Sequence, residues 1–191
     1  MTWHLLFLGE HGTRTEGDCV HLEGHTSSVS VIVDEEKNIL IDTGARHRFE
    51  DVRSGLKKIG IQWEEITDVI LTHFHLDHAG NVARLPDHVN LFAWQHNWKY
   101  GDTIRLPTLH AFALTSHVKI YNTPGHTPEH NSVLYECDEG KVIFAGDAIN
   151  EHYFKTHEVK SLNFDNELYK KSANWIIKNA DIIVPGHGQI L

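Results

Sequence analysis

Short apolar runs separated by polar turns follow one another along the 191-residue chain, and they predict a protein rich in β-strands. Residues 29–33 and 38–41 are two such runs, and the polar segment 34–37 between them predicts a hairpin. Similar runs predict strands at 69–71, 90–93, 118–121, 132–135, 142–145 and 182–184.

A different spacing predicts helices between these strands. Phe49, Val52, Leu56 and Ile59 recur at helical spacing, and Gly60 is placed to end that helix. A last helix is expected at about 166–179, and another is expected to begin at Ala79. Because the strands come in two groups, each followed by helices, the pattern predicts a mixed α/β fold.

Candidate metal ligands gather where the predicted strands end. Residues 72–80 read Thr-His-Phe-His-Leu-Asp-His-Ala-Gly, so one turn can aim four ligand side chains at one point. Imidazole nitrogen and carboxylate oxygen suit zinc and similar divalent ions. With three residues from later loops, the candidates are His73, His75, Asp77, His78, His126, Asp147 and His187. Seven ligands exceed the needs of one four-coordinate ion, which favours a two-metal hydrolytic centre.

The order of these residues, His-x-His-x-Asp-His followed by His, Asp and His, resembles the metallo-β-lactamase superfamily. The segment Ile-Asp42-Thr-Gly is also typical of that family. The resemblance implies an αββα sandwich, in which two mixed β-sheets lie face to face and helices cover the outer faces. It also implies a single domain over residues 1–191.

The resemblance further implies a role for each ligand. His73, His75 and His126 would bind the first metal ion, and Asp77, His78 and His187 would bind the second. Asp147 would bridge the two ions, with a hydroxide between them that attacks an ester, lactone, thioester or similar bond of a small substrate. Asp77 would also act in catalysis, by orienting the hydroxide or passing a proton. Zinc is the expected metal, and manganese or iron would also fit.

Composition narrows the partners. The formal net charge of −9 argues against nucleic acid as the main partner, because nucleic-acid binders usually carry a basic surface. The two cysteines, Cys19 and Cys137, are expected to be free thiols, although the sequence leaves a disulfide open. Without a secretory signal or a membrane-spanning stretch, we expect a cytoplasmic protein with no membrane association. Its oligomeric state stays open, a homodimer included.

Several other residues could have either a structural or a functional role. Asp42 is expected to be a turn residue or a partner of a ligand rather than a ligand itself. His130 is expected on the surface or in structural packing, slightly ahead of a role beside a ligand. Aromatic residues at 94–100 are expected to cover a core rather than line a substrate pocket: Trp94, His96, Trp98 and Tyr100. Five histidines are assigned to the surface or the core: His4, His11, His21, His88 and His110.

The substrate is harder to predict, since one fold hosts many chemistries. Asp147 stands where one branch of secreted β-lactamases has a cysteine ligand. We therefore do not expect β-lactamase activity. Thr123-Pro-Gly-His126-Thr-Pro and Gly146-Asp147-Ala148 resemble the N-acyl homoserine lactone lactonases. The short, compact layout also resembles the proteins similar to metallo-β-lactamase domain-containing protein 1. Such lactonases place a tyrosine just after the bridging aspartate. Here Asn150 and Tyr153 follow at greater distance, so their part in catalysis stays open.

Three other functions remain as alternatives. A phosphodiesterase or ribonuclease would use the same two ions, with the acidic charge counting against it. A mononuclear iron sulfur dioxygenase would use a site of the His73, His75 and His126 type. A non-catalytic metal-dependent binding module is disfavoured by the complete ligand set.

Overall fold

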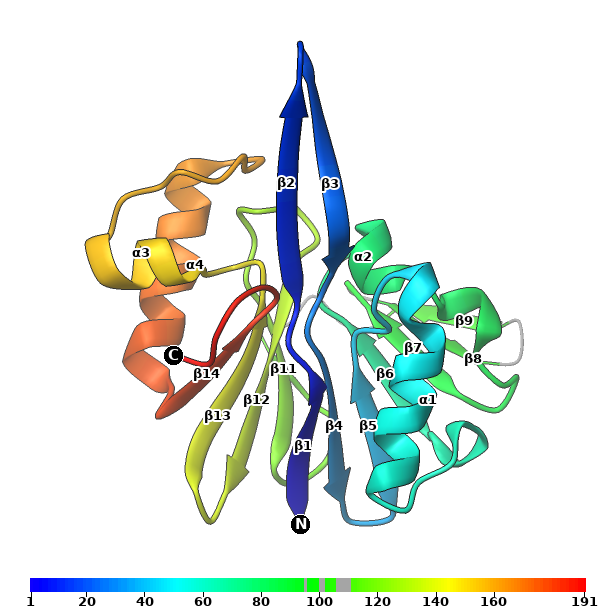
Figure 1. Ribbon diagram of the computed structural model, residues 1–191. Helices are drawn as coiled ribbons and strands as arrows, with labels where there is room; N and C mark the ends of the chain where they lie inside the picture. The colour runs from blue at the N-terminus through cyan, green and yellow to red at the C-terminus, as the bar shows by residue number, and fades with distance from the viewer. Residues whose placement is uncertain (95, 100–101, 106–110) are drawn as a thin grey trace.

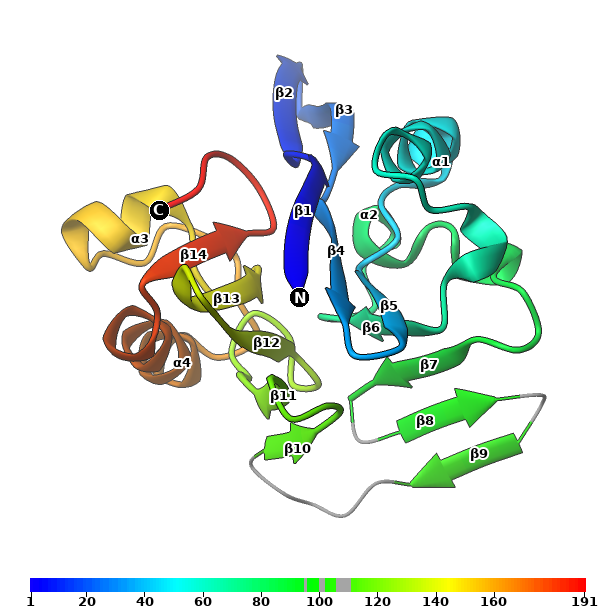
Figure 2. The same cartoon turned by 90° about the horizontal axis from the view of Figure 1, so that it is seen from below.

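Two β-sheets packed face to face form the centre of the computed structural model, which describes residues 1–94, 96–99, 102–105 and 111–191. In Figure 2, α1 lies outside one sheet, and α3 and α4 lie outside the other. The order of layers is therefore helix, sheet, sheet, helix, and the predicted αββα sandwich is confirmed.

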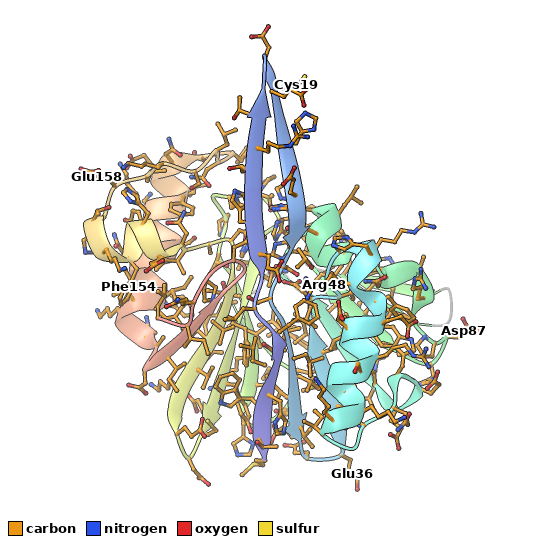
Figure 3. The ribbon with its side chains drawn as sticks, in the orientation of Figure 1. Cys19, Glu36, Arg48, Asp87, Phe154 and Glu158 are labelled. Atoms are coloured by element: carbon orange, nitrogen blue, oxygen red, sulfur yellow. The ribbon has the colours of Figure 1, made fainter. Side chains whose placement is uncertain are left out.

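The first sheet has seven strands in the spatial order β1-β4-β5-β6-β7-β8-β9. Their bounds are β1 Thr2–Phe7, β4 Val29–Asp34, β5 Lys37–Ile41, β6 Asp68–Leu71, β7 Asn90–Ala93, β8 His96–Lys99 and β9 Asp102–Arg105. The second sheet has five strands in sequence order: β10 Ala111–Ala113, β11 Val118–Asn122, β12 Asn131–Cys137, β13 Gly140–Gly146 and β14 Ile182–Pro185. A separate hairpin of β2 (Glu10–Glu16) and β3 (Cys19–Thr26) projects beyond the sheets, with Cys19 near its tip (Figures 1 and 3).

Within the described residues, four α-helices complete the fold: α1 Phe49–Lys58, α2 Leu76–Ala79, α3 Glu151–Thr156 and α4 Asn166–Asn179. Short 3₁₀ turns lie at Arg46–Arg48, Trp63–Glu65 and Val82–Arg84. Among the described residues, no helix combines the length and apolar character that crossing a membrane requires. Both cysteines are free, as expected.

Three apolar clusters hold these layers together. One joins α1 to the outer face of the first sheet through residues such as Leu56 and Val69. The second lies between the sheets, where Ile39 and Ile70 of one sheet face Phe144 of the other. The third packs α3 and α4 against the second sheet. Burial of this apolar surface is the main force that fixes the strand ends, and hence any side chains that they carry.

Most predicted elements are confirmed, including the hairpin of β4 and β5 and the bounds of α4. The helix predicted to begin at Ala79 is wrong, because α2 instead ends there. The helix ends there because the backbone amides of Gly80 and Asn81 donate to the Gly44 carbonyl and the Thr43 hydroxyl, both at 3.1 Å, instead of to carbonyls of the helix. Strands β1, β2, β3 and β8 to β10 and helix α3 were not predicted. The predicted roles of Tyr100 and His110 lie outside the described residues.

Candidate metal centre

The candidate ligands come from loops that end at one edge of the sandwich. Strands β11 and β13 both run antiparallel to β12, and β13 and β14 pair in parallel, so all three end at the same edge of the second sheet. His126, Asp147 and His187 follow these strand ends, and residues 73–78 follow β6 of the first sheet. The fold therefore brings together residues that lie far apart in the sequence.

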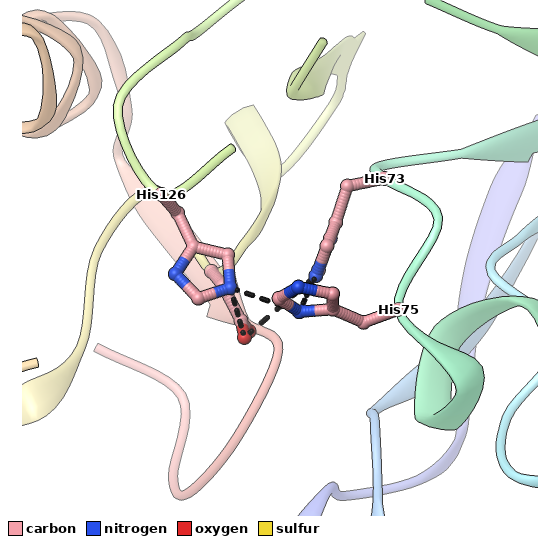
Figure 4. Close-up of side chains that lie close together, drawn as sticks. His73, His75 and His126 are labelled. Atoms are coloured by element: carbon pink, nitrogen blue, oxygen red, sulfur yellow. Dashed lines mark hydrogen bonds and ion pairs between the residues drawn. The ribbon is translucent and has the colours of Figure 1, made fainter. Parts of the chain in front are cut away.

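One cluster consists of three histidines and Asp147 (Figure 4). His75 Nδ1 lies 2.9 Å from His73 Nε2 and 3.2 Å from His126 Nε2. Asp147 Oδ2 lies 3.4 Å from His126 Nε2 and 4.0 Å from His73 Nε2. Four ligand atoms from two sheets thus point toward one small volume.

A second cluster adjoins the first and consists of Asp77, His78 and His187. Asp77 Oδ2 lies 3.2 Å from His187 Nε2 and 3.5 Å from His78 Nε2. Asp147 contacts this cluster too, since its Oδ1 lies 3.4 Å from His78 Nε2 and its Oδ2 lies 3.7 Å from His187 Nε2. Asp147 is therefore the carboxylate that both clusters share, and all seven sequence-derived candidates meet at one place.

These separations fit ligands around metal ions. Two atoms bound to one tetrahedral zinc ion, each at about 2.0–2.1 Å, are about 3.4 Å apart. The distances of 2.9–4.0 Å in the two clusters span that value. His78 Nε2 is buried without a hydrogen-bond partner, although it lies between two carboxylates. An orphaned buried nitrogen is costly, and a divalent ion at this point would satisfy it.

Hydrogen bonds behind the clusters set which ring nitrogen of His73 and of His78 faces inward. Asp42 Oδ2 accepts from His78 Nδ1 at 2.7 Å and from the Thr72 hydroxyl at 2.8 Å. With its only proton used in this way, the Thr72 hydroxyl accepts from His73 Nδ1 at 3.1 Å. Both histidines are thus protonated at Nδ1 and present the lone pair of Nε2, as partners of metal-bound histidines usually ensure. Asp42 therefore contacts a candidate ligand rather than facing the centre itself.

Comparison with known proteins agrees with this geometry. Residues 22–187 match the sequence pattern of the metallo-beta-lactamase superfamily. The chain belongs to the metallo-beta-lactamase superfamily. It is 27% identical to metallo-beta-lactamase domain-containing protein 1 of Xenopus laevis, over 97% of this chain and 78% of that protein. It is 30% identical to an N-acyl homoserine lactonase of a Bacillus species, over 69% of this chain and 60% of the lactonase.

A solved structure shows the same superfamily fold. A metallo-beta-lactamase-type protein of Thermotoga maritima superposes with a TM-score of 0.76 at 21% identity, covering 99% of this chain and 97% of that one. Several other curated relatives are longer, and the chain spans 48–61% of their length.

The protonation states of several candidate ligands are the ones that metal binding requires. Burial lowers the pKa of His73, which keeps its ring neutral. Burial alone would raise the pKa of Asp77, but the hydrogen bond from His187 and the nearby His78 lower it to about 2. Burial likewise opposes ionisation of Asp147, whereas His78 holds the pKa of that carboxyl well below its usual range. The His73 ring and the two carboxylates are thus in the forms that bind metals. Burial opposes a charge on His78 and on His187, but the neighbouring carboxylates raise the pKa of both rings, so a metal ion would bind there in place of a proton.

Two further residues orient ligands without belonging to the motif. Asn163 Oδ1 accepts from His126 Nδ1 at 3.3 Å, which leaves His126 Nε2 facing the centre. His130 is fully buried, so of the two expected positions structural packing holds and the surface does not. Its Nε2 accepts from the backbone amide of Asp147 at 3.1 Å, and its Nδ1 donates to the Thr123 hydroxyl at 3.0 Å. His130 therefore packs structurally and also holds the backbone of a candidate ligand.

Other expectations concern residues around the centre. Trp98 packs against the core of the first sheet, as expected, and the described aromatic residues near it do not line the pocket at the centre. Tyr153 is buried and donates to Asn174 at 3.3 Å, whereas Asn150 lines the pocket and caps α3. Tyr153 is thus held away from the centre.

The sequence reading missed two histidines of the β2–β3 hairpin. His25 Nε2 lies 3.2 Å from Asp77 Oδ2, and His11 lies beside His25, with 3.1 Å between their Nδ1 atoms. His11 is exposed, as expected, but it lines the pocket. A Gly17-Asp18 turn between two polar runs was the only signal of this hairpin in the sequence.

Proposed function

We propose that the protein is a hydrolase whose centre holds two divalent ions, most suitably zinc, and that it cleaves an ester, lactone or thioester bond of a small substrate. The observation that carries this proposal is the position of Asp147 between two complete ligand clusters. A single-metal protein would not need the second cluster.

Each side chain has a role in this proposal. His73, His75 and His126 would hold the first ion. Asp77, His78 and His187 would hold the second ion, and Asp147 would contact both. Two bound ions supply a water of lowered pKa and polarise the bond to be cleaved. The donor set of imidazole and carboxylate, with no described thiolate, suits zinc and also accommodates manganese or iron.

Asp77 is the residue we propose to act on the nucleophilic water. Its side chain is accessible to the pocket, and its lowered pKa keeps the carboxylate ionised. An ionised carboxylate accepts a hydrogen bond from water, which orients the water toward the substrate. A pKa this low favours orientation of the water over uptake of its proton. Asp147 is the less suitable base, because its carboxylate lies 3.4 Å from both His78 Nε2 and His126 Nε2 and would contact both ions.

The pocket above the centre supports a small substrate with an apolar part. Its volume is about 930 Å³, within the range usual for small-molecule sites. Leu76 and Leu162 line it and are 83% and 95% exposed, so the rim offers apolar surface that a ligand could bury. Arg46 and Lys160 also line the pocket. The likeness to an N-acyl homoserine lactonase makes an acylated lactone the first substrate class to test.

The test is turnover of a substrate panel by the zinc-loaded protein, with lactones, thioesters, carboxylic esters and phosphodiesters as substrates. Asp147→Ala and His78→Ala should lose the second ion and most hydrolysis while the fold survives. His88→Ala, at an exposed position away from the centre, should behave like wild type. Turnover of no ester-type substrate by protein that holds two ions would contradict the proposal. Turnover of phosphodiesters alone would move the assignment to a nuclease, and iron-dependent oxygen uptake with persulfides would move it to a dioxygenase.

A further inference from the structure

We propose that His25 of strand β3 is an additional ligand of the second metal ion, next to Asp77, His78 and His187. The inference rests on the proposed two-metal centre and adds an eighth side chain to it. The hairpin that carries His25 would then be part of the metal site rather than a surface projection.

The backbone of the hairpin turns His25 toward the centre. Between two paired positions, β2 advances two residues, from Glu10 to Gly12, while β3 advances three, from Glu23 to Thr26. The extra residue lies at Gly24, whose φ is +62°. This is a bulge with glycine in the left-handed conformation, a device that bends a strand and re-aims the side chain beside it. His25 is the side chain that follows.

The position of the His25 ring matches that of an established candidate ligand. His25 Nε2 and His187 Nε2 both lie 3.2 Å from Asp77 Oδ2. The two rings are nearly parallel, with 15° between their planes and 4.8 Å between their centroids. Both separations from Asp77 fit neighbouring ligands of one zinc ion, which are about 3.4 Å apart. His25 is therefore aimed at the same ion as Asp77 and His187.

His11 completes the arrangement from the neighbouring strand. The Nδ1 atoms of His11 and His25 are 3.1 Å apart, so one of them must donate to the other. If His25 Nε2 binds an ion, its Nδ1 carries the proton and donates to His11. Metal-bound histidines commonly donate their second ring N–H to such a partner. His11 is thus a positioning residue for His25.

Backbone hydrogen bonds fix the foot of the hairpin to both loops of the second cluster. The Ser27 amide donates to the Asp77 carbonyl at 3.1 Å, and the Ser28 amide donates to the Gly186 carbonyl at 2.7 Å. The Gly188 amide donates to the Gly9 carbonyl at 3.1 Å. His25 lies two residues from this anchored foot, so its ring is held near the centre even though the tip of the hairpin projects into solvent (Figure 1).

The test measures the affinity of each ion in apo-protein by titration with zinc against a chromophoric chelator. His25→Ala and His25→Gln should each lower the affinity for the second ion about tenfold or more and leave the affinity for the first unchanged. His11→Ala should lower the affinity for the second ion by a smaller factor. His21→Ala is the matched control, because His21 lies on the same strand, is exposed and contacts Glu16 rather than the centre. The visible spectrum of the cobalt-loaded protein should also change in His25→Ala, since a ligand of the second ion is lost.

The outcomes separate this inference from the proposed function. Suppose that the wild type binds two ions and that His25→Ala has the same zinc affinities and the same cobalt spectrum. That result would overturn this inference and leave the proposed function intact. Full recovery by His25→Gln would also overturn it, because an amide can keep the hydrogen bond to Asp77 but is a poor metal ligand. A wild type that binds no second ion would overturn both.

Discussion

Replacing Asp42 by asparagine changes one atom and should disturb both metal positions. Asp42 has φ of +58°, and asparagine tolerates this left-handed conformation, so the backbone is expected to stay in place. The Asp42 carboxylate accepts three hydrogen bonds: from the Thr72 amide at 2.8 Å, from the Thr72 hydroxyl at 2.8 Å and from His78 Nδ1 at 2.7 Å. An asparagine oxygen can keep the first, but its NH₂ group then faces two donors.

The magnitude follows from these contacts. His78 can avoid the clash of donors by moving its proton to Nε2, which removes the lone pair that would bind the second ion. The Thr72 hydroxyl, which orients His73, loses its acceptor at the same time. Loss of such a partner typically weakens metal binding by about 10–100-fold, or about 1.4–2.8 kcal/mol. We expect that loss for the second ion and a smaller loss for the first.

The assay is competitive zinc titration of Asp42→Asn beside Asp68→Asn. Asp68 is an equally buried carboxylate that accepts from Lys37 and Asn90, away from the lining of the metal pocket. Both variants should lose stability, because hydrogen bonds to charged groups contribute about 1.5–3 kcal/mol each. Only Asp42→Asn should lose metal affinity. Affinities for both ions within twofold of wild type would refute the role of Asp42.

Two further predictions concern residues behind the ligands. Burial lowers the pKa of His130 to about 3, so the unfolded chain binds a proton between pH of about 6.5 and about 3 that the folded chain does not, and stability falls as pH falls. In urea unfolding of apo-protein, the free energy of unfolding should fall between pH 7 and pH 5 by about 2 kcal/mol less in His130→Gln than in wild type. Equal decreases in the two proteins would contradict this. Gly186→Ala would place its Cβ 2.0 Å from Asp147 Oδ1, so metal affinity should fall, whereas Gly60→Ala has no atom within 4 Å and should cost only stability through its φ of +82°.

The sequence predicted the parts of the molecule that are buried or carry the motif. Strands such as β4 and β6 are apolar runs between the layers, and α4 has a clear apolar face, so their positions follow from hydrophobicity. The seven ligands could be found because their order and residue types are specific. The sequence could not show the metal, the substrate or the number of ions bound.

What could not be predicted depends on long-range contacts. Hairpin β2–β3 is largely exposed on both faces, so it has no apolar alternation to reveal it. The place of His25 depends on a backbone bulge at Gly24, and the burial of His130 depends on the loop that it supports. In each case the residue type alone favoured a surface position.

Metal content is the measurement that tests the central claim most directly. Protein purified without added metal, analysed by plasma mass spectrometry beside Asp147→Ala, should contain about two divalent ions per chain in wild type and fewer in the variant. One ion per chain in both proteins would contradict the shared role of Asp147, and a single iron would favour the dioxygenase alternative.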